Sequence, residues 1–205
     1  GGYGEGDRFL GLLVPTVRAI SRRHRELSLL DLADMLASSW HEHRQAALFV
    51  LENRFRRSSF ADRKEIATFY LTHLNSVNNW DLVDSSAPQI LGTYLLDQKR
   101  TVLYDLASSG QLWHQRVAVV ATFQFIRAGQ FTDTLRLANL LLDHSHHLIH
   151  KAVGWMLREI GKRDQTVEER FLDLHADHMP RTMLRYAIER FEPARRRSYL
   201  QRRAQ

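Results

Sequence analysis

Four stretches of the chain share one helical pattern: residues 44–51 (RQAALFVL), 80–87 (WDLVDSSA), 116–123 (RVAVVATF) and 151–158 (KAVGWMLR). In each stretch, apolar residues recur at the spacing of one face of an α-helix. The starts of successive stretches stand 36, 36 and 35 positions apart. A pattern that returns at such regular intervals predicts an internal repeat with an equivalent helix in each copy.

Helical spacing also runs through the rest of the chain, where strict alternation of apolar and polar residues is nearly absent. Helix starts are legible at Ser28, Asp164 and Pro180. Four prolines and ten glycines are few turn-forming residues for the many turns of an all-β chain. We therefore predict an all-α fold with short connections. The expected helices span residues 15–25, 28–38, 41–56, 60–74, 77–84, 86–96, 99–108, 112–128, 131–142, 147–161, 165–176 and 181–191, and a short basic helix follows near 194–203.

A two-helix unit of about 35 residues is typical of HEAT-like solenoids. The repeat therefore favours a solenoid, with a compact helical bundle as the alternative. In stacked repeats, equivalent positions line up on one surface, usually the inner, concave one. We expect a single domain over residues 1–205, with a basic tail from about residue 193.

Composition excludes several classes of protein. The chain has no cysteine, so it forms no disulfides and has neither a thiolate zinc site nor a cysteine nucleophile. Neither a membrane-spanning run nor a signal peptide is evident, and the glycine-rich phosphate-binding motifs of nucleotide cofactors are missing. We expect a soluble, cytoplasmic protein.

The charge of the chain points to a polyanionic partner. Lys and Arg number 29 against 23 Asp and Glu, which gives a net charge of +6, and only four of the 29 are lysines. Arginine binds phosphate through a planar, bidentate fork. Nucleic acid is therefore the favoured partner, although a coding bias toward arginine would produce the same composition.

The segment 79–84 (NWDLVD) is the strongest candidate for chemistry. Trp80 and Asp84 lie one helical turn apart, so an aromatic face stands beside an anion. This pair suits a cationic ligand, because the indole attracts a cation and the carboxylate neutralises charge that develops nearby. The alternative is structural: Trp80 belongs to the core, and Asp81 or Asp84 caps a helix at Ser85.

The predicted repeat places further residues beside this pair. Trp155 stands one turn after Lys151, as Asp84 stands one turn after Trp80. We expect Trp80, Asp84, Arg116, Lys151 and Trp155 to share one surface, with Arg44 at the equivalent position of the first repeat. Arg44, Arg116 and Lys151 would there neutralise phosphates of a nucleic acid.

Several motifs together resemble the AlkD-like family of DNA alkylation repair glycosylases. They are residues 8–11 (RFLG) with 14–15 (VP), then 79–84 (NWDLVD), 113–118 (WHQRVA) and 151–159 (KAVGWMLRE). The resemblance extends from about residue 3 to about residue 192. Members of the family generally carry a further helical segment before the stretch at which this chain begins.

The resemblance implies roles for individual residues. Asp84 matches the family's catalytic carboxylate, and Trp80 and Trp155 match the two tryptophans that flank the lesion nucleotide. Arg116 matches the arginine that supports the DNA backbone near the lesion. Tyr3 is the nearest candidate for the family's N-terminal tyrosine.

The resemblance also implies a fold and an activity. The fold is a right-handed superhelical solenoid of HEAT-like repeats with a concave basic face. The activity is hydrolysis of the N-glycosidic bond of cationic lesions, 3-methyladenine and 7-methylguanine, in base-excision repair. The family works without metal or cofactor. We therefore expect a monomer that acts on double-stranded DNA containing alkylated bases and associates with the nucleoid. A non-catalytic DNA-structure binder and a protein-interaction scaffold are the alternatives.

A histidine cluster carries a weaker hypothesis. His144, His146, His147 and His150 stand at spacings that can chelate a metal, but no carboxylate partner accompanies them in an ordered motif. A loop and helix start near DNA phosphates, or plain surface, is the favoured interpretation.

Overall fold

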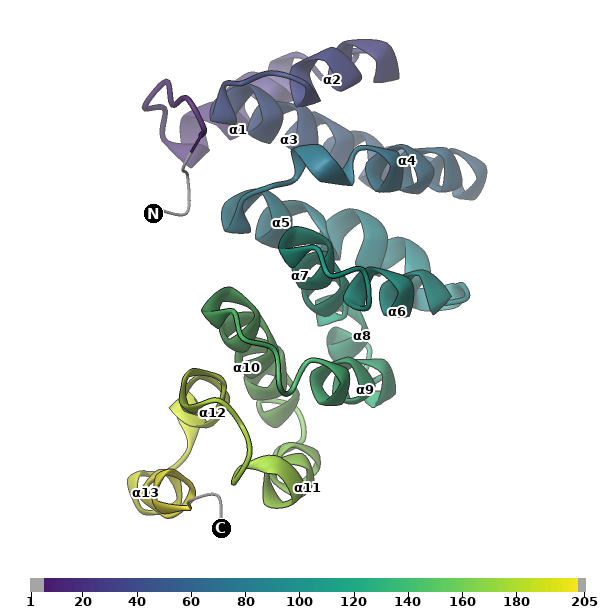
Figure 1. Ribbon diagram of the computed structural model, residues 1–205. Coiled ribbons are helices and arrows are strands. Elements are labelled where there is room, and N and C mark those ends of the chain that lie inside the picture. The colour runs from purple at the N-terminus through teal and green to yellow at the C-terminus, as the bar shows by residue number, and fades with distance from the viewer. Residues whose placement is uncertain (1–5, 203–205) are drawn as a thin grey trace. The chain divides into compact units, whose positions relative to one another are not determined.

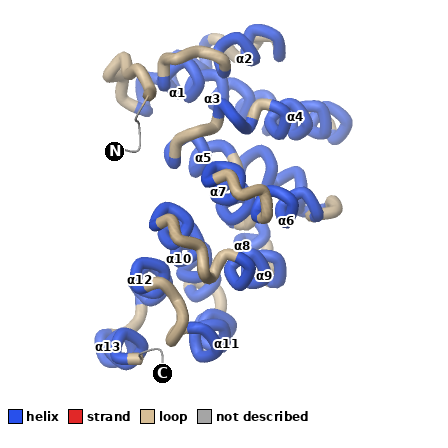
Figure 2. Tube along the Cα trace, in the orientation of Figure 1, coloured by secondary structure: helices blue, strands red, loops and turns tan. Residues whose placement is uncertain are grey.

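The computed structural model describes residues 6–202 and is all-α, as the sequence predicts. Figure 2 shows helices joined by loops, with no strand in this part of the chain. Arg8 and Trp40 form an isolated parallel bridge, in which the amide of Arg8 donates to Ser39 O and that of His41 donates to Arg8 O. This bridge attaches the N-terminal segment to the start of the third helix.

The chain divides into two compact units, Gly1–Gln98 and Lys99–Gln205, called unit 1 and unit 2 below. In Figure 1, unit 1 runs from purple to blue-green and unit 2 from there to yellow. The helices of unit 1 are α1 (Val14–Arg23), α2 (Leu29–Leu36), α3 (His41–Arg57), α4 (Phe60–Thr72), η1 (Leu74–Ser76), α5 (Trp80–Ser86), η2 (Pro88–Gly92) and η3 (Leu95–Asp97).

Helix α3 is the centre of unit 1, because α1, α2, α4 and α5 all pack against it. Its side chains Leu48, Phe49, Leu51 and Phe55 are almost completely buried. Burial of apolar side chains of this size contributes about 2 kcal/mol each. The helix that carries the Trp80–Asp84 pair therefore rests on the core of unit 1.

In unit 2 the corresponding centre is α10, which packs most extensively against α12 and also contacts α7 and α11. The helices of this unit are α6 (Thr101–Ala107), α7 (Leu112–Ala121), α8 (Phe123–Arg127), α9 (Thr132–Leu140), α10 (His147–Gly161), α11 (Gln165–His175), α12 (Arg181–Ala187), η4 (Ile188–Arg190) and α13 (Pro193–Gln201).

Gly154 makes the close packing of α10 on α12 possible. A Cβ atom at this position would stand 2.4 Å from Met183 O and 2.6 Å from Tyr186 Cβ. Only glycine fits such an approach of two helices without a shift of the backbone. The glycine of the segment 151–159 is thus explained by packing, one residue before Trp155.

Predicted helix starts agree with the structure. The Ser28 side chain accepts from the Asp31 amide, and the Asp31 carboxylate accepts from the Ser28 amide, so the two residues form a capping box at α2. Asp164 caps α11 by accepting from the Val167 amide at 3.1 Å. The expected basic helix near the C-terminus is present as α13.

Two expected helices differ from those observed. The helix expected over 112–128 is divided into α7 and α8 at Thr122, whose hydroxyl donates to Val119 O at 2.7 Å and so competes with the helical backbone. The helix expected over 86–96 contains a π-helical turn at η2, where the Gly92 amide donates to Ala87 O. This wider turn begins at Pro88, which has no amide hydrogen to donate.

The two-helix repeat, its superhelix, the basic concave face and the single domain stay predictions. Within residues 6–202, no helix is both long and apolar enough to cross a membrane.

Glu168 of α11 gives unit 2 a pH-dependent stability. Its carboxyl is buried against the backbone of Gly161, and no hydrogen-bond partner for Oε1 lies within the described residues. Burial, with the negative charge of Glu169 adding to it, raises the pKa of Glu168 to about 8. A carboxyl with a raised pKa contributes stability below its unfolded-state pKa, and this stability is lost as the pH rises through the folded-state value.

We predict that Glu168→Gln, a neutral side chain of the same shape, removes this loss. Relative to the parent, the variant should gain about 2 to 4 kcal/mol in free energy of unfolding between pH 4.5 and pH 9. Urea denaturation at the two pH values measures the change. The matched control is Glu192→Gln, an exposed glutamate of the same unit. A constant difference between variant and parent at both pH values would contradict the prediction.

Candidate functional site

Helix α5 presents Trp80 and Asp84 on one side, one turn apart. The Trp80 side chain is unusually exposed for an indole, with 45% of its surface accessible, and Asp84 is half-buried. Leu82 and Val83 between them are fully buried and attach the helix to unit 1. The helix continues through Ser85 to Ser86, so neither Asp81 nor Asp84 caps a helix there. The structural alternative, in which Trp80 is a core residue and Asp81 or Asp84 caps a helix at Ser85, is therefore wrong.

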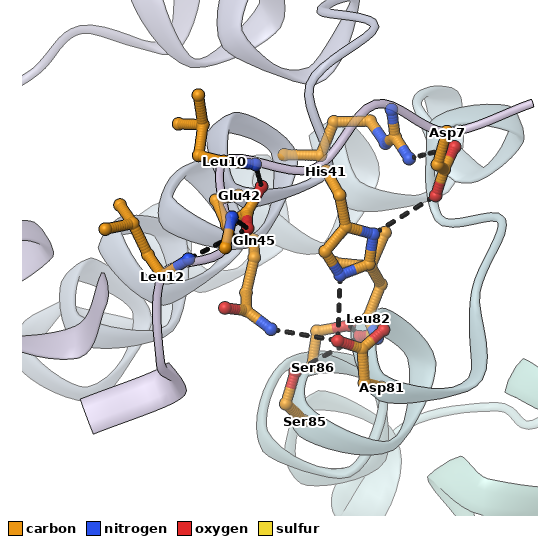
Figure 3. A network of polar contacts seen from close by, with 12 residues as sticks. Asp7, Leu10, Leu12, His41, Glu42, Gln45, Asp81, Leu82, Ser85 and Ser86 are labelled. Atoms are coloured by element: carbon orange, nitrogen blue, oxygen red, sulfur yellow. Dashed lines mark hydrogen bonds and ion pairs between the residues drawn. The ribbon is translucent and has the colours of Figure 1, made fainter. Parts of the chain in front are cut away.

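Asp81 fixes the first turn of α5. Its Oδ2 lies 2.8 Å from Nε2 of His41 and accepts from Nε2 of Gln45 at 3.0 Å, while its Oδ1 accepts from the amide of Leu82 (Figure 3). His41 and Gln45 stand one turn apart on α3. Two side chains of the central helix thus hold the helix that carries Trp80 and Asp84.

His41 bridges two carboxylates. On its other side, Nδ1 lies 3.1 Å from Asp7 Oδ2, and Nη2 of Arg44 lies 2.7 Å from the second oxygen of Asp7. Burial by itself would lower the pKa of His41, but the hydrogen bonds and charges of Asp81 and Asp7 outweigh it and raise that pKa. An imidazolium, which donates from both nitrogens, fits this position.

Glu42 holds the chain that precedes α1. Its carboxylate accepts from the amides of Leu10, Gly11 and Leu12 at 2.9, 2.9 and 3.2 Å, and Figure 3 shows it facing this segment. Gly11 has a φ of +77°, a left-handed conformation that favours glycine. Burial would raise the pKa of Glu42, but the amide hydrogen bonds lower it overall.

The negative charge of Asp84 affects the pKa of Tyr70, which lies in the core of unit 1. Burial raises the pKa of Tyr70, and the nearby negative charge of Asp84 raises it further, while the hydrogen bond between Tyr70 and Ser86 lowers it. The hydroxyls of Tyr70 and Ser86 lie 2.9 Å apart. This neutral pair fills the side of α5 that faces the core.

Unit 2 places Trp155 and Lys151 one turn apart on α10, both half-buried. The Trp155 indole donates to Glu159 Oε1 at 3.3 Å, and its ring lies 5.9 Å from that of Phe123. Burial would raise the pKa of Glu159, but Lys162, Arg163 and Trp155 together lower it. Trp155 is therefore held in place by a carboxylate on one side and an aromatic ring on the other.

Arg44 and Arg116, both predicted to bind DNA, are buried. Arg44 donates to Ser38 O as well as pairing with Asp7, and Arg116 donates to Leu148 O at 2.6 Å, in the first turn of α10. In this structure each guanidinium serves the packing of its own unit. Their contact with DNA stays a prediction.

The histidine cluster forms the start of α10. His146 accepts from the Leu148 amide at 3.1 Å, and His144 accepts from the His146 amide at 3.0 Å. Burial lowers the pKa of both rings, and the neighbouring histidines lower it further. Among the described residues, no three or more His, Cys, Asp or Glu side chains are grouped to hold a metal.

The predicted site residues do not all lie in one described unit. Tyr3 lies outside the described residues. Trp80 and Asp84 belong to unit 1, whereas Arg116, Lys151 and Trp155 belong to unit 2. The surface expected to unite these five residues stays a prediction.

The cluster of Asp7, His41, Gln45 and Asp81 was not predicted from the sequence. The available signal was a run of polar side chains, residues 41–45 (HEHRQ), directly before an apolar stretch. Four of these five residues, all except His43, are buried. The partners of His41 and Gln45 in this cluster lie 34 to 40 positions away, so only the folded chain reveals them.

Comparison with known proteins agrees with this picture of an all-α protein. The family model described as DNA alkylation repair enzyme matches residues 3–191. The chain therefore belongs to the DNA alkylation repair enzyme family.

A solved structure from Enterococcus faecalis, a predicted DNA alkylation repair enzyme, has the same fold. Its TM-score is 0.74 at 15% sequence identity, and the match covers 93% of this chain and 92% of that chain. No curated protein matches the sequence.

We predict that Glu42→Gln loosens the segment before α1. A glutamine has one acceptor oxygen, and its amide hydrogens would face backbone amides, so at least one hydrogen bond to residues 10–12 is lost. Amide exchange in this segment should accelerate about tenfold or more, which corresponds to about 1.4 kcal/mol. Hydrogen exchange with mass spectrometry measures it, with Glu65→Gln on the exposed face of α4 as control. Equal exchange in the two variants would disprove the role of Glu42.

Proposed function

We propose that the protein is a monofunctional DNA glycosylase that hydrolyses the N-glycosidic bond of cationic alkylated purines in base-excision repair. The substrates are 3-methyladenine and 7-methylguanine in double-stranded DNA. The observation that carries the proposal is the pair on α5: an exposed indole and a half-buried carboxylate one turn apart, on a helix anchored to the core. Membership of the DNA alkylation repair family supports it.

A carboxylate can promote cleavage of the N-glycosidic bond of a cationic base without a metal ion. An alkylated purine carries a positive charge, so it leaves as a neutral base without being protonated first. As the bond between C1′ and the base nitrogen breaks, positive charge develops on the deoxyribose. The Asp84 carboxylate stabilises this charge and orients the water that adds to C1′. The water loses a proton, and the sugar is left as an abasic site.

Trp80 and Trp155 supply aromatic surface for the cationic nucleotide. An indole face attracts a cation by about 0.5 to 1 kcal/mol at an exposed site and by about 2 kcal/mol when water is excluded. The Glu159 carboxylate and the Phe123 ring limit the orientations of Trp155. Preorganised aromatic faces lose little entropy when the lesion binds.

We predict that Asp84→Asn abolishes most excision. The amide keeps the size of the side chain but removes the negative charge, so the excision rate should fall roughly 10²-fold or more, which corresponds to about 3 kcal/mol. Duplex binding should persist, because a negative charge is removed from a DNA-binding protein. Release of free base from methylated duplex measures the rate, and Asp34→Asn, an exposed aspartate of unit 1, is the control.

Two results would contradict this proposal. A folded Asp84→Asn variant that excises at the parent rate would exclude Asp84 as the catalytic carboxylate. A parent protein that binds duplex but releases no base would favour a non-catalytic DNA-structure binder.

We predict that duplex binding weakens with salt and that Lys151 contributes to this dependence. Each phosphate contact contributes about −0.9 to the slope of log affinity against log salt concentration. Lys151→Gln should therefore make the slope shallower by about 0.9, whereas Lys64→Gln on α4 should leave it unchanged. Fluorescence anisotropy of an undamaged duplex at several salt concentrations gives both slopes. Binding that does not depend on salt would point to a protein partner in place of DNA.

A further inference from the structure

The start of α3 contains a chain of buried charges that links three segments of unit 1. Asp7 comes from the N-terminal segment, His41 and Arg44 from α3, and Asp81 from α5. The side chains of Asp7, His41 and Arg44 are only 8%, 4% and 5% exposed, whereas that of Asp81 at the end of the chain of charges is 25% exposed. Buried charges are stable only when they are paired with good geometry.

The pairing is complete only when His41 is protonated. Nδ1 faces Asp7 and Nε2 faces Asp81, and a neutral imidazole carries a hydrogen on one nitrogen alone. The other nitrogen would then direct a lone pair at a carboxylate. With the imidazolium, two cations, His41 and Arg44, balance the two carboxylates.

The other neighbours of His41 do not supply the positive charge of its imidazolium. Gln45 is neutral and donates to the same Asp81 oxygen, and the ring of Phe9 stacks on the imidazole at 4.9 Å. The carboxylate of Glu42, next to His41 on α3, is turned toward the amides of residues 10–12. Protonation of His41 therefore decides whether its ring donates to both Asp7 and Asp81.

Asp81 lies directly after Trp80 and three residues before Asp84, on a helix of only seven residues. A shift of its carboxylate moves the first turn of α5, which carries the indole. In enzymes, a displacement of about 1 Å of a positioned group can cost about 10²-fold in rate. The contacts that run from Asp7 through His41 to Asp81 thus end on α5, the helix that carries Trp80 and Asp84.

We propose that His41 is a positioning residue, whose protonated ring clamps α5 to the N-terminal segment and so sets Trp80 and Asp84 for base excision. This inference rests on the proposed glycosylase function. His41 itself does not touch the reacting atoms.

The clamp has a direction of pH dependence. Burial lowers the pKa of His41, but Asp81 and Asp7 outweigh it and raise that pKa above its usual value, so the clamp is intact below the raised pKa. It is lost as the pH rises through that raised value. Excision should therefore show an alkaline decline that originates in His41.

The first test compares His41→Gln with His43→Gln, an exposed histidine on the same helix. A glutamine at position 41 can donate to one carboxylate but cannot bridge both. Under single-turnover conditions with methylated duplex, we expect His41→Gln to excise at least tenfold more slowly with unchanged duplex affinity, and to lack the alkaline decline. His43→Gln should match the parent in rate, affinity and pH profile.

A second variant keeps the test decisive if His41→Gln folds poorly. In Asp7→Asn, the amide nitrogen can donate to a neutral His41 ring while the amide oxygen takes the place of the Asp7 oxygen that lies 2.7 Å from Nη2 of Arg44. We expect the alkaline decline to disappear from the pH profile of Asp7→Asn, because the bridge then no longer requires a proton. A profile with the same decline as the parent would overturn the proposal, as would parent-like excision by His41→Gln.

Hydrogen exchange separates the failure of this inference from the failure of the proposed function. If the parent releases no base, the glycosylase proposal fails, and the clamp is judged by exchange of the α5 amides alone. Faster exchange at residues 80–86 in His41→Gln than in His43→Gln supports the clamp. Equal exchange overturns it.

Discussion

Buried charge at the start of α3 is the constraint on which unit 1 depends. Water cannot solvate these groups, so each must find its partner within the protein. Glu42 finds it in backbone amides of the N-terminal segment, and His41 finds it in Asp7 and Asp81. The segment before α1 and the first turn of α5 are thereby fixed to the same end of one helix. The exposed Trp80 and half-buried Asp84 depend on that anchor, since α5 is too short to be stable alone.

In unit 2, polar contacts of charged side chains are likewise made at both ends of one central helix, α10. Arg116 reaches the first turn of this helix through Leu148 O, and Glu159 near its other end gathers Lys162, Arg163 and the indole of Trp155. Trp155 is thus placed by polar contacts along its own helix, and Gly154 lets that helix lie close to α12. In both units a candidate tryptophan stands on a helix that is held by contacts of buried charged side chains, and these include Arg44 and Arg116, which were predicted to bind DNA.

Local order was predictable from the sequence, whereas long-range pairing was not. Apolar spacing and caps such as Ser28 and Asp164 act within a few residues, so the helices and their starts could be predicted. Trp80 and Asp84 could be proposed as a site because both lie in one short motif. The contacts of His41 join positions 34 and 40 residues away, and nothing in the residue types alone specifies them. Arg44 illustrates the same limit, because a buried arginine and a phosphate-binding arginine look identical in a sequence.

The central mechanistic claim is that Asp84 acts on a sugar whose base departs because it is already cationic. The most direct measurement compares single-turnover excision of 7-methylguanine with that of hypoxanthine, a neutral purine, at the same position of the same duplex. A carboxylate that stabilises the sugar, without an acid to protonate the base, predicts release of 7-methylguanine while hypoxanthine stays attached. Excision of both bases at similar rates, or release of neither from a bound duplex, would contradict this account.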